Sequence, residues 1–459
     1  TPTALGTEKI GKLLMQYAIP AIIAMTASSL YNMVDSIFIG HGVGAMAISG
    51  LALTFPLMNL AAAFGSLVGV GAATLISMRL GQRDYETAQR VLGNVLVLNL
   101  IIGIAFGLVA LLFLDPILYF FGASEATIGY AREYMTVILL GNVVTHMYLG
   151  LNSVLRASGH PRKSMYATIN TVVINTILDP LFIFGFGWGI RGAAIATVLA
   201  QVIALIWQFH ILSDKSELLH FRPGIYRLRR KIVRDILAIG MSPFLMNLAA
   251  CFIVILINKG LKEYGGDLMI GAYGIVNRLA FFFVMIVLGV NQGMQPIAGY
   301  NFGAKQYDRV MHVLKLTMIG ATCVTTAGFL LGEFMPRLAV GMFTSDEELI
   351  RLAVEGMRIV FFCFPIIGFQ MVATNFFMSI GMAGKAIFLS LSRQLLFLMP
   401  GLIFLPHIFD VCTEWNGSWG VWCSMPLSDF LASLVAFFML TYQLRKFRAI
   451  GAENAAKEG

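Results

Sequence analysis

Two aspartates in strongly apolar surroundings are the residues of this chain with the clearest capacity for chemistry. Asp35 and Asp179 each lie in a run long enough to cross a bilayer, where an ionised side chain costs about 2.5 kcal/mol or more. Asn32 precedes Asp35 by three residues and Asn175 precedes Asp179 by four, so each amide neighbours its carboxyl on a helix. Oxygen-rich groups suit a hard cation, and burial favours the protonated carboxyl. The pattern predicts a site for H⁺ or Na⁺.

The elements that carry these residues place them at one depth. Asp35 lies about one turn before the expected end of its span, and Asp179 lies nine residues before Trp188, an expected interfacial anchor. Thr197 follows the start of the next span and reaches a similar level. Pro180 lacks an N–H, which frees a carbonyl one turn earlier. We therefore expect Asp35, Asn175, Asp179 and Thr197, with Asn32 nearby, to hold the coupling ion, and the same four to hold Na⁺ if the ion is a metal.

A second set of residues is a candidate lining for a substrate cavity. Methionine (25) and phenylalanine (35) are abundant, and flexible Met-rich surfaces accept varied ligands. The residues singled out are Tyr31, Met147, Asn152, Arg278 and Asp429. Asp429 forms either a second polar site or a helix-packing hydrogen bond, and Arg278 is either paired or lines a central cavity. His146 is a core histidine or a proton relay.

The composition identifies lipid as the solvent. Hydrophobic residues make up 58% of the 459 residues and charged residues only 12%, about half the usual share of a soluble domain. No Asp, Glu, Lys or Arg occurs in 42–78, 91–114, 279–304 or 359–384, and each run exceeds the roughly 20 residues of a membrane-spanning helix. The ~10-residue alternating segments of a β-barrel are not seen.

The fold class expected is therefore all-α, a polytopic membrane protein with twelve spans in two pseudo-symmetric six-helix bundles. The predicted spans are 13–39, 46–78, 91–114, 132–155, 164–187, 191–212, 235–258, 268–298, 310–332, 352–379, 386–409 and 419–444.

Basic residues predict the orientation. With the N-terminus inside, the inner segments hold 24 of the 32 Lys and Arg residues, which predicts cytoplasmic termini. This asymmetry accounts for the net charge of +8 without any nucleic-acid partner. We expect an N-terminal lobe at 1–212, a basic cytoplasmic linker at 213–234, and a C-terminal lobe with a tail at 235–459.

The two halves repeat at an offset of 222 residues. The segment 81–85 (GQRDY) aligns with 303–307 (GAKQY), and Gly159 and Lys163 align with Gly381 and Lys385. Six spans per half give both repeats one orientation, as in transporters whose site lies between or within two bundles. The repeat partners of Asp35 and Asp179 are not acidic, so coupling is predicted in the first lobe alone.

Several segments together resemble the multidrug and toxic compound extrusion (MATE) family, and most closely its prokaryotic DinF-type branch. They are Val34–Gly40 (VDSIFIG), Gly69-Val70-Gly71 ahead of Arg79-Leu80-Gly81, Arg156–Gly159 (RASG), and Asn175–Pro180 (NTILDP) followed by Phe184-Gly185. The resemblance covers nearly the whole chain.

The resemblance implies an exporter of amphipathic, often cationic compounds driven by entry of H⁺ or Na⁺, with no other cofactor. It implies coupling roles for Asp35, Asn175, Asp179 and Thr197, and helix bending at Pro20. It further implies a bacterial inner-membrane protein, and we expect a monomer.

Three other functions were weighed. A lipid-linked saccharide flippase would need a cluster of basic residues lining its cavity, and only Arg278 is available, which counts against this function. A membrane enzyme finds no support, since HExxH and GxSxG motifs are absent from the sequence. A symporter differs only in transport direction. Cys412 and Cys423 flank a loop expected outside the cell, so a disulfide between them was left open.

Overall fold

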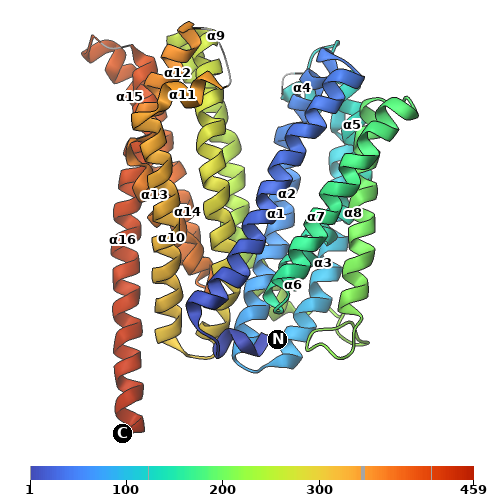
Figure 1. The fold of residues 1–459 in the computed structure, drawn as a ribbon, viewed down its shortest axis with the longest axis vertical. Coiled ribbons are helices and arrows are strands. Elements are labelled where there is room, and N and C mark those ends of the chain that lie inside the picture. The colour runs from blue at the N-terminus through green and yellow to red at the C-terminus, as the bar shows by residue number, and fades with distance from the viewer. Residues whose placement is uncertain (1, 122, 343–346, 415) are drawn as a thin grey trace. The chain divides into compact units, whose positions relative to one another are not determined.

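Helices make up most of the part that the structure describes. A computed structural model describes residues 2–121, 123–342, 347–414 and 416–459, and within these ranges it contains helices and no strand (Figure 1). The first half comprises η1 (Pro2–Gly6), α1 (Ile10–Gly42), α2 (Ala45–Gly81), α3 (Tyr85–Leu112), α4 (Leu114–Phe120), α5 (Ile128–Leu140), α6 (Asn142–Ala157), α7 (Pro161–Pro180), η2 (Leu181–Gly185) and α8 (Ile190–Leu212).

The second half begins with one long helical segment. It comprises α9 (Arg230–Gly303), α10 (Tyr307–Phe334), α11 (Pro336–Gly341), α12 (Glu347–Val360), η3 (Phe361–Cys363), α13 (Phe364–Ser379), α14 (Ala383–Leu391), η4 (Ser392–Leu398), α15 (Met399–Cys412) and α16 (Gly417–Glu458).

The predicted spans all have helical counterparts. Eleven helices in the described residues are long and apolar enough to cross a membrane, and a bent pair, α5 and α6, brings the number to twelve. That pair is bent by 57° and forms the predicted fourth span. The break falls at Gly141, where an added Cβ would lie 2.7 Å from Val198 of α8. One detail of the prediction was wrong: the backbone stays helical through 259–267, where a loop was expected between two spans.

Two compact units divide the chain. Unit 1 holds residues up to Glu8 and Ile19–Phe244, and unit 2 holds Lys9–Ala18 and Leu245–Gly459. The first turns of α1 therefore belong to unit 2, and the first turns of α9 belong to unit 1. The lobe boundaries expected from the charge pattern, 212 and 235, stay a prediction.

The backbone shows the 222-residue repeat directly. Arg83 and Lys305 occupy equivalent positions, and each adopts a left-handed φ, of 59° and 60°, that non-glycine residues rarely take. The equivalent glycines Gly159 and Gly381 also have positive φ, of 96° and 78°. The helices α3 and α10 begin and end at equivalent residues, as the bounds above show. Two unrelated halves would not share such local backbone features.

Equivalent glycines also mark equivalent helix crossings. A Cβ on Gly71 of α2 would lie 2.0 Å from the carbonyl oxygen of Ile236 in unit 1. A Cβ on Gly293 of α9, its repeat partner, would lie 2.5 Å from Cα of Ala18 in unit 2. In each unit, the first turns of a helix whose remainder belongs to the other unit pack against a glycine. A side chain at that glycine would not fit, and small residues allow such close approach in membrane helix packing.

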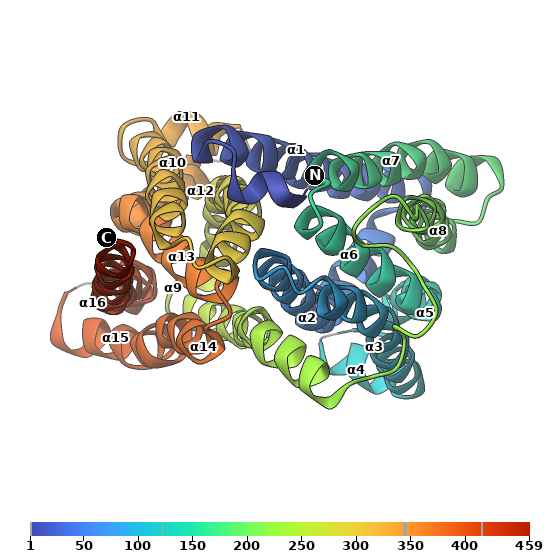
Figure 2. The same ribbon diagram turned by 90° about the horizontal axis from the view of Figure 1, so that it is seen from below.

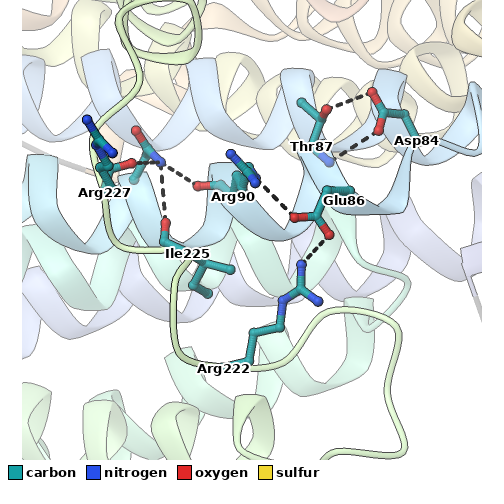
Figure 3. A network of polar contacts seen from close by, with 8 residues as sticks. Asp84, Glu86, Thr87, Arg90, Arg222, Ile225 and Arg227 are labelled. Carbon is teal, nitrogen blue, oxygen red and sulfur yellow. Dashed lines mark hydrogen bonds and ion pairs between the residues drawn. The ribbon is translucent and has the colours of Figure 1, made fainter.

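The segment between α8 and α9 is fixed to the start of α3. The buried Asn94 amide donates to the carbonyls of Ile225 (3.5 Å) and Arg227 (3.3 Å), and its oxygen accepts from the backbone N–H of Arg229 (3.1 Å). Figure 3 shows Glu86 of the same helix between the guanidinium groups of Arg90 and Arg222. This connecting segment is therefore a fixed part of unit 1.

The same connecting segment also contacts the start of α7. His160 Nε2 lies 3.1 Å from Glu217 Oε2. Burial lowers the pKa of the His160 imidazole, and the neighbouring Glu217 acts in the opposite direction. The contact therefore adds to the attachment without requiring a charged histidine.

Replacing Asn94 should detach the connecting segment. In Asn94→Ala, backbone groups at 225–229 lose their partners, which should cost about 1–3 kcal/mol of local stability. Amide hydrogen exchange at 225–229 should accelerate accordingly. Asn99→Ala is the matched control, because Asn99 lies on the same helix, is equally buried and has no side-chain hydrogen bond. Equal acceleration in both variants would contradict the assignment.

Candidate cation-coupling site

Three helices of unit 1 bring the predicted coupling residues together. Helix α1 carries Tyr31 and Asp35 one turn apart, α7 carries Asn175 and Asp179 with the same spacing, and α8 carries Thr197. A spacing of four residues places both members of a pair on one helix face. The sequence pattern thus gives each helix one polar stripe in an otherwise apolar surface.

Hydrogen bonds join the three helices at this level. The Tyr31 hydroxyl donates to Asp179 Oδ2 (3.3 Å) and lies 3.4 Å from Thr197 Oγ1. Asn175 Nδ2 donates to Thr197 Oγ1 (3.3 Å), whose own hydroxyl donates to the Ala193 carbonyl (3.1 Å). Thr197 therefore links the amide on α7 to the phenol on α1.

The two carboxyl groups lie next to each other and away from solvent. Asp35 and Asp179 are 6% and 0% exposed, and their side chains are within hydrogen-bonding range of one another. Two carboxylates this close repel each other, so a proton or a cation between them stabilises the pair. Buried Oδ1 atoms of Asp35, Asn175 and Asp179 have no hydrogen-bond partner. These oxygens fit H⁺ or Na⁺, since buried polar atoms require a partner.

Irregular backbone follows directly after the second carboxylate. Helix α7 ends at Pro180, and the five residues of η2 continue as a π-helical turn. Such turns are rare and occur frequently at functional sites. The π turn was not predicted, and the free carbonyl expected one turn before Pro180 stays a prediction.

Two tyrosines extend the site beyond what the sequence indicated. Tyr31 was singled out for a substrate cavity, but its hydroxyl contacts Asp179 and Thr197. Tyr134 of α5 was not considered; it is 3% exposed and interacts electrostatically with both Asp35 and Asp179. The four-residue spacing of Tyr31 and Asp35 could have indicated the first. Nothing in the sequence around Tyr134 points to the carboxyl groups.

The remaining candidates of unit 1 differ in their exposure and contacts. The Asn32 side chain is exposed, and Pro20 is buried inside α1, two residues beyond the boundary between the units. Met147 is 5% exposed. Asn152 donates to Thr168 (3.1 Å) and accepts from Gln208 (2.7 Å), as a helix-packing residue does. Substrate contact by Met147 and Asn152 stays a prediction.

In the described part of unit 2, the buried carboxylate of Asp429 pairs with a basic side chain and not with a second carboxylate. Asp429 of α16 is 3% exposed and accepts a hydrogen bond of 2.6 Å from Nε of Arg393 in η4. Arg393 lies ten residues inside the span Ala383–Cys412. Asp429 therefore has an ionic partner that the sequence analysis missed. The other candidate, Arg278, has an exposed side chain.

The structure also shows the surroundings of His146 and the state of two cysteines. His146 is buried with Nε2 at 3.0 Å from the Ala61 carbonyl, an arrangement that suits a packed histidine. Cys412 and Cys423 are both free thiols in the structure. Among the described residues no group of three or more His, Cys, Asp or Glu side chains could hold a metal ion, so any Na⁺ site would depend on amide and hydroxyl oxygens as well.

A bundle of membrane-spanning helices with paired acids inside it defines a polytopic transporter rather than an enzyme. The comparison with known families agrees, because the MatE family model matches residues 20–181 and 241–403, more than half of the chain. The chain belongs to the MatE family.

Characterised relatives match over nearly the full length. The chain is 28% identical over 438 residues to the multidrug export protein MepA of Staphylococcus aureus (strain NCTC 8325 / PS 47), covering 95% of this chain and 94% of that protein. It is 27% identical to MepA of Staphylococcus haemolyticus (strain JCSC1435), with the same coverage.

Solved structures match as well. The MATE multidrug transporter DinF-BH, determined in complex with R6G, is 36% identical with a TM-score of 0.86, over 95% of this chain and 96% of that one. An outward-facing multidrug resistance MATE family transporter of the MOP superfamily has a TM-score of 0.91 at 24% identity, over 97% and 98% of the two chains. The latter likeness shows the fold alone.

Proposed function

We propose that this protein is a multidrug efflux transporter that exports amphipathic, often cationic compounds by antiport with H⁺ or Na⁺. The observation that carries the proposal is the pair of neighbouring buried carboxyl groups, Asp35 and Asp179, with three buried oxygens that lack partners. Family membership supports export of drugs, since the relatives MepA and DinF-BH are described as multidrug transporters. Such activity would confer drug resistance on the cell.

The coupling works through the charge of the carboxyl pair. A cation entering from outside moves down the membrane potential, which supplies about 2.3 kcal/mol per 100 mV for each charge. Once Asp179 is neutralised, it accepts hydrogen bonds less strongly, so its contact with Tyr31 weakens and α1 is released from α7. The cation and the drug must favour different states of the protein for one to drive the other.

The ion and the substrate are assigned to different residues. Asp35, Asn175, Asp179 and Thr197 offer carboxylate, amide and hydroxyl oxygens, a set that serves either a proton or Na⁺. Pro20, buried inside α1, is the proposed bending point of that helix. Substrates are proposed to contact Met147, Asn152 and Arg278.

The proposed setting is the bacterial inner membrane, with both termini cytoplasmic and the protein monomeric. The excess of Lys and Arg in the segments assigned to the inside supports this orientation. The saccharide-flippase alternative loses support, because Arg393 is paired with Asp429 and does not add to a basic cavity.

Dye efflux from everted vesicles tests the proposal. A pH gradient and a sodium gradient are imposed separately, and efflux of a cationic dye is followed by fluorescence. Efflux driven by one gradient identifies the ion. Efflux that responds to neither gradient, in vesicles that contain verified folded protein, would overturn the antiport proposal.

A further inference from the structure

A pocket lies at the start of α1, beside the start of α10, whereas Asp35 lies near the other end of α1. Its volume is about 540 Å³, and the residues that line it belong to unit 2. Figure 2 shows the first turns of α1 beside α10. It is lined by Lys9, Ile10, Gly11, Lys12, Asp308, Arg309, His312 and Leu316. Since α1 and α10 are candidate membrane spans that begin here, the pocket lies at the level where a span leaves the membrane.

The lining combines basic and apolar residues. Lys9, Lys12 and Arg309 carry positive charge against the single carboxylate of Asp308. Lys9 and Lys12 are one turn apart and exposed. Arg309 is oriented by a hydrogen bond of 2.9 Å from its Nε to Asn301 Oδ1. The arrangement suits a ligand with an anionic group and apolar chains.

Apolar contacts come from the remaining lining residues. Leu316 lies two turns beyond Arg309 on α10, so both face the same side of that helix. Gly11 of α1 faces Leu316 of α10: a Cβ added at Gly11 would lie 3.9 Å from Leu316 Cδ1, an ordinary contact distance. The pocket thus passes from charged residues at the helix starts to an apolar surface one to two turns deeper.

The internal repeat allows this pocket to be compared with the equivalent surface of unit 1. An offset of 222 residues maps Asp308–Leu316 onto Glu86–Asn94 of α3. In unit 1 that surface is covered by the chain itself, through Arg222 on Glu86 and through the backbone of 225–229 on Asn94. In unit 2 the equivalent surface is the open basic pocket.

We propose that the pocket binds the headgroup of an anionic phospholipid, whose phosphate contacts Lys9, Lys12 and Arg309 while its acyl chains follow Leu316. Basic pockets between membrane helices recognise such headgroups, and each Lys or Arg near the surface adds to the attraction. The bound lipid holds the first turns of α1 against α10, as the connecting segment covers α3 in unit 1.

Lipid binding to the purified full chain tests this inference independently of transport. Phosphatidylglycerol and phosphatidylcholine are added to detergent-solubilised protein, and bound lipid is counted by native mass spectrometry. We expect a retained phosphatidylglycerol, little phosphatidylcholine, and an affinity for phosphatidylglycerol roughly tenfold or more lower in Lys9→Gln/Lys12→Gln. Glycerol phosphate and inorganic phosphate are tested as competitors and should compete only weakly.

The matched control removes the same charge elsewhere in unit 2. Arg445→Gln/Arg448→Gln replaces two exposed basic residues of α16 and should leave phosphatidylglycerol binding unchanged. An equal loss in both double variants, or no loss in either, would overturn the site. Competition by inorganic phosphate at the affinity of the lipid would assign the pocket to a soluble phosphate ligand instead and reject the lipid.

Discussion

Asp179→Asn and Asp35→Asn should each abolish efflux of a dye against its gradient. Each substitution removes an ionisable oxygen from the buried pair while keeping the side-chain volume, so the cation no longer changes the charge of the site. Loss of one coupled charge removes about 2.3 kcal/mol per 100 mV, which corresponds to an about 50-fold smaller attainable drug gradient. Everted-vesicle efflux under an imposed gradient measures this directly.

Binding and folding separate coupling from a structural role. Both variants should remain monodisperse in detergent, because relieving the repulsion between two buried carboxylates does not cost stability. Their dye affinity should persist but lose its dependence on pH or Na⁺. Asp115→Asn is the control, since Asp115 forms an exposed ion pair with Arg132 in the same unit. Uphill efflux at the wild-type rate in Asp35→Asn would refute the coupling role.

Charge and repeat patterns were sufficient for most of the fold. The charge clusters divided the chain into twelve apolar segments, because ionised side chains are costly in lipid, and each segment has a helical counterpart. The offset of 222 residues reappears in the left-handed backbone of Arg83 and Lys305. The bend at Gly141 was not predicted, since it depends on how closely Val198 of another helix approaches.

The candidate site was only partly predictable, for a related reason. Spacing along one helix placed Asn175 beside Asp179, but the contact of Tyr31 with Asp179 depends on the packing of α1 on α7. Arg393 was missed because it lies near a basic loop in the sequence. The structure places it inside the span, where Asp429 from α16 neutralises it. A charge near a span end can be assigned only once its partner on another helix is known.

Arg393→Leu should destabilise the protein strongly. It leaves Asp429, which is 3% exposed, without its ionic partner, and breaking a buried pair in this way costs about 3–5 kcal/mol. Asp429→Asn should cost less, because Arg393 is one-third exposed and its guanidinium can reach water. Thermal unfolding in detergent, followed by tryptophan fluorescence, gives the ranking.

Two further variants decide whether the buried charge is the cause. The double variant Arg393→Leu/Asp429→Leu should recover most of the lost stability, since apolar replacement of a whole buried pair is often close to neutral. Arg337→Leu is the matched control: Arg337 and Glu347 also lie 2.6 Å apart, but both are largely exposed, so the change should stay within about 0.5 kcal/mol. Arg393→Leu should also regain stability relative to wild type as the pH falls, because protonation of Asp429 removes the unpaired charge. A pH-independent loss that the double variant does not relieve would show that Arg393 acts through packing and not through its charge.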